Sequence, residues 1–288
     1  MDTLMAALLD LLRELEALGL PLVVGGGLGL HLKREEIRQS GQRTLLKELP
    51  DARSTNDIDM FLRAEILADL DRTKGVAGVI AKLEYEPVDA AKYLQWKKSV
   101  RVAGNDLEVK IDILVGPIGA HRSKLKVSPP RVRPKGDIKF HAHMVEEAIH
   151  VEEHQARLPV AGKTSNGEEY SGTVYVPDAL PYLLMKLHAF KDRKDDGEKD
   201  FGRHHAMDCY TIVAMMTEEE FERAKAVLRE ERETAHVKKA QSIVSEDFAT
   251  PTSAGTLRLR EHKSFRPELQ TEEFISILKE LFAVPDVR

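Results

Sequence analysis

The chain has 288 residues, of which 42% are hydrophobic and 32% are charged, with a formal net charge of −5. This composition is typical of a globular protein with room for one large domain or two ordinary ones. The single cysteine, Cys209, excludes an internal disulfide and a cysteine-rich zinc site. The longest apolar runs are far shorter than the roughly 20 residues that a membrane helix needs, so we expect a cytoplasmic protein.

The chain begins with leucines at helical spacing. They stand at positions 4, 8, 11, 15 and 18, and charged residues interrupt the apolar stretch, so an amphipathic helix is predicted instead of a signal peptide. A short buried strand is expected over residues 21–24. The turn Gly25-Gly-Gly27 then leads into a helix over residues 28–36. Backbone amides at such a turn can approach a phosphate group, although a tight turn that needs positive φ is an equally good interpretation.

A strand is predicted over residues 56–62. Asp57 and Asp59 are two residues apart, so their side chains leave the same face of this strand, while Ile58 and Met60 point to the other face. Neighbouring carboxylates repel each other, and a divalent cation such as Mg²⁺ relieves that repulsion. An isolated pair of this kind is more often solvated at a sheet end, so its meaning depends on the surrounding residues. A helix is expected over residues 64–72.

Two further strands, over residues 93–102 and 107–115, are predicted to pair as a hairpin through the turn at 103–106. Alternating apolar residues define one face of the second strand and leave Asp112 on the other. If this strand neighbours that of Asp57 and Asp59, three carboxylates converge. Such a triad suits phosphoryl transfer with two metal ions about 4 Å apart.

Positive charge is concentrated in the middle of the chain. Between Lys92 and Lys139 there are twelve basic and four acidic residues, and the segment from Arg122 to Lys135 has six basic residues and no acidic one. Its prolines predict irregular backbone. A solvated basic loop is the usual interpretation, and a phosphate-rich partner is favoured only if catalytic residues lie beside the segment.

The second half is predicted to be mostly helical, after a short strand over residues 173–176. Asp178 is expected to cap a helix that runs to Arg193, and a last helix is expected over residues 271–282. Lys186 lies within an apolar part of the first of these helices. A buried lysine needs an anionic partner, which a triphosphate would supply, although a surface lysine with a packed stem is more common. We therefore predict two domains, 1–176 and 177–288.

The other candidate residues are interpreted as structural. The histidines at positions 141, 143, 150 and 154 lack the zincin spacing and are predicted to form a solvated face, although 150 and 154 would face each other on a helix. Trp96 is predicted to be a core residue, and Cys209 a small buried hydrophobe.

Several segments together resemble a known family. They are Val23-Val-Gly-Gly-Gly27, Arg53-Ser-Thr-Asn-Asp-Ile-Asp59, Lys110-Ile-Asp-Ile-Leu114, residues 183–193 and residues 199–213. Their order is similar to that of polymerase-β-like nucleotidyltransferases, and within them to the AbiEii type, the toxin half of bacterial abortive-infection (type IV toxin–antitoxin) systems. The resemblance covers roughly residues 20 to 215, and no motif matches beyond it.

The resemblance implies an α+β fold, in which a nucleotidyltransferase core with a mixed sheet is followed by a mostly helical C-terminal domain that contributes nucleotide-binding residues. It implies that Asp57, Asp59 and Asp112 are the catalytic residues and bind two Mg²⁺ ions, with Mn²⁺ as the alternative. The nucleotide-binding residues it implies are Gly26, Gly27, Arg53, Lys186 and Asp208, with Asp200 as the alternative to Asp208.

The chain departs from the family pattern at two places. The interval between Gly26 and Asp57 is longer than usual, so residues 36–52 are interpreted as an insertion. His204 and His205 stand where the family has an Arg-Asp pair.

The function that the resemblance implies is transfer of a nucleotide from a nucleoside triphosphate to an acceptor hydroxyl. RNA, in particular the 3′ end of tRNA, is the implied acceptor, and a cognate antitoxin is an implied partner. An antibiotic-type adenylyltransferase with a small-molecule acceptor and a non-catalytic nucleotide-binding regulatory module are the alternatives.

Overall fold

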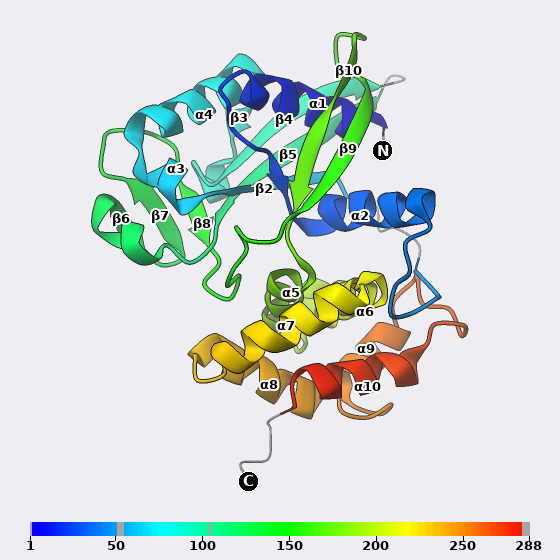
Figure 1. Ribbon diagram of the computed structural model, residues 1–288. Coiled ribbons are helices and arrows are strands. Elements are labelled where there is room, and N and C mark those ends of the chain that lie inside the picture. Colours follow the sequence, from blue (N-terminus) through cyan, green and yellow to red (C-terminus); the bar gives the residue numbers. More distant parts are fainter. Residues whose placement is uncertain (1, 51–54, 103–104, 284–288) are drawn as a thin grey trace. The chain divides into compact units, whose positions relative to one another are not determined.

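The computed structural model describes residues 2–50, 55–102 and 105–283, and the chain divides into two compact units (Figure 1). The first unit consists of residues 1–32 and 54–177 and contains a mixed β-sheet. The second consists of residues 33–53 and 178–288 and is helical. The predicted α+β class, with a mixed sheet and a helical C-terminal region, is confirmed.

Within the described residues, ten strands form one sheet. Eight of them follow the order β6-β7-β8-β5-β2-β1-β10-β9, while β4 pairs with β5 and β3 pairs with β4. The strands are β1 (Val23–Val24), β2 (Asp57–Leu62), β3 (Glu86–Pro87), β4 (Gln95–Val102), β5 (Asn105–Val115), β6 (Leu125–Ser128), β7 (Arg131–Pro134), β8 (Ala142–Met144), β9 (Ala156–Lys163) and β10 (Glu169–Val176). Because β2 pairs in parallel with β5 and antiparallel with β1, the sheet is mixed.

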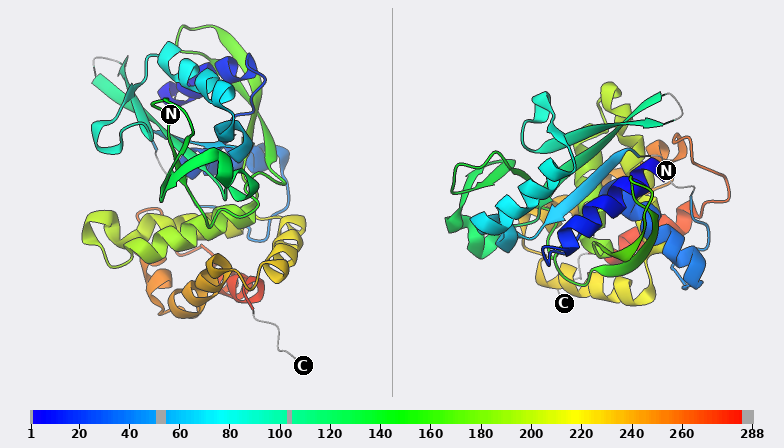
Figure 2. Two further views of the ribbon diagram at one scale, coloured as in Figure 1. Left: turned by 90° about the vertical axis from the view of Figure 1, so that its left-hand side faces the viewer. Right: turned by 90° about the horizontal axis from the view of Figure 1, so that it is seen from above.

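Helices cover one face of this sheet. Figures 1 and 2 show α1 and α4 side by side over it, and α1 contacts β2, β9 and β10. The helices and 3₁₀ turns that begin in this unit are α1 (Asp2–Glu16), α2 (Gly26–Ser40), α3 (Ala64–Ala68), α4 (Leu70–Lys82), η1 (Asp89–Ala91) and η2 (Gly119–Lys124). Four of the five leucines predicted for the apolar stripe of the first helix are buried. The exception is Leu18, which lies beyond the helix end and is 48% exposed.

The helix predicted over residues 64–72 is two helices. Asp69 ends α3 and caps α4, because its side chain accepts hydrogen bonds from the backbone N–H groups of Asp71 and Arg72. An aspartate inside a helical pattern competes for backbone donors in this way, so it breaks the helix where apolar periodicity alone would continue it.

The predicted hairpin of β4 and β5 is confirmed. The irregular backbone expected for the basic segment is wrong, because β6 and β7 form an antiparallel hairpin there and β7 joins the sheet through β8. A second error concerns β9, which was not predicted and pairs along its whole length with β10. In each case the apolar residues of a short strand face the core, but charged residues and prolines between them hide the alternation.

The second unit is built from helices that pack around aromatic side chains. Its elements are α5 (Ala179–Arg193), η3 (Gly197–Gly202), α6 (Arg203–Met215), α7 (Glu218–Glu230), α8 (Ala235–Asp247), α9 (Ala254–Arg260) and α10 (Thr271–Leu281). The central buried rings are those of Tyr182, Phe190, Tyr210, Phe248 and Phe274. Asp178 caps α5 as predicted, since its side chain accepts from the N–H of Ala179 at 2.9 Å.

Residues 33–53 belong with the helical unit, although the sequence analysis placed the whole of 1–176 in the first domain. The Leu45 N–H donates to the Met216 carbonyl at 2.8 Å, and the Tyr210 hydroxyl donates to the Glu48 carbonyl at 3.1 Å. Lys33 forms a buried ion pair with Glu220. The segment interpreted as an insertion is therefore part of the helical unit's packing.

Within the described ranges, every helix falls short of the length and hydrophobicity that a membrane-spanning segment requires.

Candidate active site

The site is built on the parallel pairing of β2 with β5. Asp59 lies directly across from Asp112, and Asp57 lies across from Lys110. Residues directly opposite on neighbouring strands share a face of the sheet, and so do residues two apart on one strand. The three carboxylates therefore lie on one face, while Ile58, Met60, Ile111 and Ile113 are buried on the other. The structure brings together the residues that the sequence placed on separate strands.

Asp112 has a carboxylate neighbour on one side and an amide neighbour on the other. Gln95 lies across from it on β4, and its Nε2 donates to Asp112 Oδ1 at 2.7 Å. Burial and the negative charge of Asp59 raise the pKa of Asp112 to about 6. The hydrogen bond from Gln95 opposes this rise. It also occupies one carboxylate oxygen, so that Oδ2 is left for another partner.

The glycine turn lies against Asp59. The Gly25 N–H donates to the Asp59 carbonyl at 2.7 Å, and α2 begins at Gly26, two residues earlier than predicted. Gly26 has a φ of +59°, and a Cβ there would lie 1.5 Å from Asp59 Oδ2. The turn therefore needs glycine both for its backbone conformation and for its close approach to the carboxylate. Gly27 lies in the first turn of α2.

The three aspartates fit a hard divalent cation such as Mg²⁺. They offer only oxygen ligands, which Mg²⁺ prefers, and they come from two strands whose pairing holds the side chains on one face. Burial and the neighbouring carboxylates both raise the pKa of Asp112, and a bound cation would favour its charged form. Asp57, Asp59 and Asp112 are thus the residues that would hold the predicted metal.

Lys186 and Asp208 form an ion pair inside the helical unit. The distance from Lys186 Nζ to Asp208 Oδ2 is 2.8 Å, and the side chains are only 11% and 5% exposed. A buried lysine needs an anionic partner, and within the helical unit the partner of Lys186 is Asp208. Asp200, the alternative acidic residue, pairs instead with Arg203 at 2.7 Å. Arg53, the remaining predicted nucleotide-binding residue, lies outside the described residues.

His204 and His205 both have side-chain partners. Arg193 Nη1 lies 2.6 Å from His205 Nε2, and because a guanidinium only donates, the imidazole nitrogen accepts. His204 Nδ1 lies 2.9 Å from His262 Nε2, and the Ser264 N–H donates to His262 Nδ1. This fixes the proton of neutral His262 on Nε2. Burial lowers the pKa of His262 to about 4.

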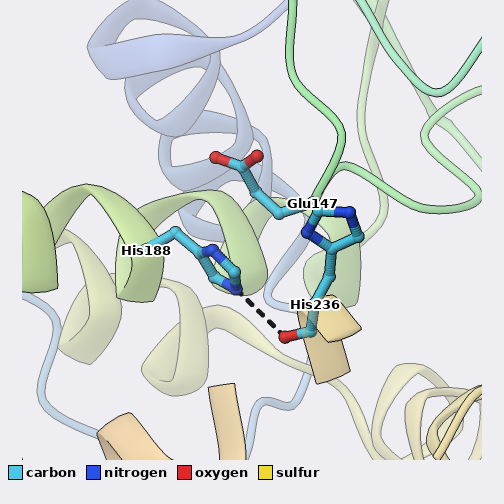
Figure 3. A group of neighbouring side chains, drawn as sticks. All are labelled: Glu147, His188 and His236. Carbon is cyan, nitrogen blue, oxygen red and sulfur yellow. Dashed lines mark hydrogen bonds between the residues drawn. The ribbon is translucent and has the colours of Figure 1, made fainter. Parts of the chain in front are cut away.

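A further histidine contact joins α5 to α8. His188 Nε2 donates to the His236 carbonyl oxygen at 3.0 Å, and Figure 3 shows this bond. Glu147, drawn in the same figure, belongs to the first unit. Imidazole nitrogens favour zinc-like ions over Mg²⁺, so this pair is no alternative to the aspartates as a magnesium site.

The histidines between residues 141 and 154 do not form a helical face. His150 and His154 have positive φ values of 57° and 47°, and residues 150–154 form turns, so the predicted helix is wrong. His141 is buried beside Arg131, which lies 2.7 Å away, and burial lowers its pKa to about 4. Cys209 is buried as predicted, and burial raises the pKa of its thiol.

Sequence reasoning missed Gln95. The predicted turn at 103–106 sets residue 102 across from residue 107 and so places residue 97 opposite residue 112. The observed register is two residues tighter, with Val102 across from Asn105, and this puts Gln95 there. It also missed the capping box that begins α7, although the spacing of Thr217 and Glu220 is the usual signal for one.

No protein-family model matches the chain, and no curated protein or solved structure matches it. The functional assignment therefore depends on the geometry described above and on the motif resemblance.

We predict that Asp112→Asn stabilises the metal-free protein at neutral pH. The folded-state pKa of about 6 lies above the ordinary value of 3.8, so ionising Asp112 destabilises the fold. The advantage of the variant should be absent below about pH 4, grow between pH 4 and 6, and reach at most about 3 kcal/mol above that range. Urea unfolding across pH 3.5–8 measures it. The exposed Asp71→Asn is the control, and equal profiles for both variants would contradict the prediction.

Gly26→Ala should disrupt the site more than an equivalent change at another left-handed glycine. Gly19 has a φ of +67° and nothing within 4 Å of an added Cβ, so Gly19→Ala should cost only the backbone strain, about 1–2 kcal/mol. Gly26→Ala adds a clash with Asp59 to the same strain. Thermal unfolding and Mn²⁺ binding compare the two variants. Matching losses of stability and metal affinity would show that the close approach to Asp59 is unimportant.

Removing one partner of the Lys186–Asp208 pair should be more harmful than removing both. Asp208→Leu alone leaves the charge of Lys186 buried, and Lys186→Met alone leaves that of Asp208. Each should cost about 3–5 kcal/mol, whereas the two substitutions together should be close to wild type. Urea unfolding of the single and double variants gives the coupling energy. A near-zero coupling would mean that the ion pair does not form. The double variant, if stable, separates loss of nucleotide binding from loss of folding.

Proposed function

We propose that the protein is a metal-dependent nucleotidyltransferase that transfers a nucleoside monophosphate from a nucleoside triphosphate to an acceptor hydroxyl. The observation that carries this proposal is the register of β2 and β5, which sets Asp59 across from Asp112 with Asp57 on the same face. The motif resemblance to AbiEii-type enzymes of the polymerase-β-like class supports it, and so does the glycine turn that lies against Asp59.

In the proposed reaction the acceptor oxygen bonds to the α-phosphorus, the bond from that phosphorus to the bridging oxygen of the β-phosphate breaks, and pyrophosphate leaves. Asp57 and Asp59 would bind both Mg²⁺ ions, and Asp112 the ion on the acceptor side. Bound Mg²⁺ would neutralise charge on the phosphate oxygens and lower the pKa of the attacking hydroxyl. Gln95 orients Asp112 by holding its Oδ1, which leaves Oδ2 for the cation.

The resemblance assigns the triphosphate to Gly26, Gly27, Arg53, Lys186 and Asp208, and RNA, specifically the tRNA 3′ end, to the acceptor position. Because Asp208 already supplies an anionic partner for Lys186, nucleotide binding by these two residues is supported by the motif resemblance alone. A cognate antitoxin is the further partner that the resemblance predicts.

Transfer of label from an α-³²P nucleoside triphosphate tests the reaction. The purified protein with Mg²⁺ should label total RNA, and Asp57→Asn or Asp59→Asn should lose more than about 100-fold of the rate. Even outer partners of metal ligands are worth about 10- to 100-fold. Asp71→Asn, which removes a 90% exposed carboxylate elsewhere in the same unit, should keep full activity.

Label that appears only in small molecules would redirect the proposal to an antibiotic-type adenylyltransferase. The proposed enzymatic activity would be contradicted if no acceptor is labelled and Asp57→Asn leaves nucleotide binding unchanged. A regulatory nucleotide-binding module would then be the better interpretation.

A further inference from the structure

Of the six basic residues from Arg122 to Lys135, two lie on η2 and three on the β6–β7 hairpin, and Lys135 directly follows β7. On β6 the side chains alternate, so that Leu125 is buried and Lys126 is exposed. On β7 Val132 is buried, while Arg131 and Arg133 are half-buried. The register sets Lys126 directly across from Arg133, and Ser128 across from Arg131. One face of the hairpin therefore carries basic side chains, and the other packs against the core.

This arrangement leaves like charges opposed. Two cations directly across from each other on neighbouring strands destabilise a hairpin unless an anion separates them. Within the described part of the chain, none of the six cations lies within 4.0 Å of a carboxylate oxygen, whereas Lys74, Lys82 and Lys163 all do. The positive charge also acts on His141, because burial lowers the pKa of this histidine and the charges of Arg131 and Arg133 lower it further.

The basic face is continuous with the face that carries the three aspartates. Arg131 lies across from His143 on β8, and His143 lies across from Leu114 on β5. Leu114 is two residues from Asp112, so the two side chains share a face. With strands about 4.8 Å apart, Arg131 lies roughly 12 Å from Asp112 along this face. The positions that join them, Leu114 and His143, carry no negative charge.

We propose that the exposed face of the β6–β7 hairpin binds the phosphodiester backbone of a nucleic-acid strand and leads its end toward Asp112. This rests on the proposed function for the identity of the reacting end, but the binding does not require catalysis. These cations have no carboxylate partner among the described residues, and no aromatic side chain lies between them in the sequence. They therefore match a ligand with repeated single negative charges and predict affinity without sequence preference.

The test uses the full chain carrying Asp59→Asn, so that no transfer occurs, and fluorescein-labelled single-stranded oligonucleotides of mixed sequence, as RNA and as DNA. The hairpin variant is Lys124→Gln with Lys126→Gln and Arg133→Gln. Its control is Lys74→Gln with Lys82→Gln and Lys163→Gln, which removes the same charge from cations that are paired with carboxylates.

The hairpin variant should lose at least about tenfold in affinity at low salt. The slope of log K against log salt should fall by about 2, since each single-stranded phosphate contact contributes about 0.7. The control should stay within about twofold of the parent. Removing opposed like charges should leave the Tm unchanged or higher, so a loss of binding is not a loss of folding. A difference between the affinities for the RNA and the DNA oligonucleotides identifies which backbone the hairpin face prefers.

Equal losses in the hairpin and control variants would overturn the proposal, because only net charge would then matter. It would also fail if polyglutamate or vesicles containing anionic lipid competed as well as the oligonucleotides at equal charge. The two proposals fail separately. If the hairpin variant loses oligonucleotide binding but the wild-type protein shows no transfer, only the proposed transferase activity is contradicted. If the protein transfers nucleotides to RNA and the hairpin substitutions change neither the transfer rate nor RNA binding, only the proposed binding surface is contradicted.

Discussion

The parallel register of β2 against β5 is the constraint on which the rest of the first unit depends. It sets Asp59 beside Asp112, and in the same step it buries Ile58 and Ile111 against the helices on the opposite face. A slip of one residue would send the carboxylates into the core and the isoleucines into the site. The free energy of burying those apolar side chains therefore also determines the positions of the charged side chains on the other face.

The register places the carboxylates of Asp59 and Asp112 side by side, and neighbouring polar groups compensate only partly for their negative charges. Gln95 gives one hydrogen bond to Asp112, and Lys110 lies across from Asp57, yet the pKa of Asp112 stays near 6. Burial is the larger cause of this raised pKa, and the charge of Asp59 adds to it. An asparagine at position 112 would keep the hydrogen bond from Gln95 and remove both contributions. In the helical unit, by contrast, the buried carboxylate of Asp208 has a cation, Lys186 Nζ, 2.8 Å away.

The sequence was sufficient for features whose signals are local and periodic. The alternation around Asp57 and Asp112, the antiparallel pairing of β4 with β5 and the cap at Asp178 all follow from side-chain spacing over a few residues. The pairing of β2 with β5 required three-dimensional information, since no local rule selects which distant strand lies beside which. The same is true of β9 and β7, whose short apolar alternation is hidden by prolines and charges, and of residues 33–53, which pack on helices far along the chain.

Cys209 is the neighbour of Asp208 on α6, and no atom of this thiol is open to solvent. Because it is the chain's single cysteine and burial raises its pKa, a thiol reagent can modify it only when α6 separates from the helices around it. The rate of that modification therefore measures how often the helical unit opens around α6. In native solution, without denaturant, it would report whether a nucleotide or an RNA slows the transient exposure of the Lys186–Asp208 region.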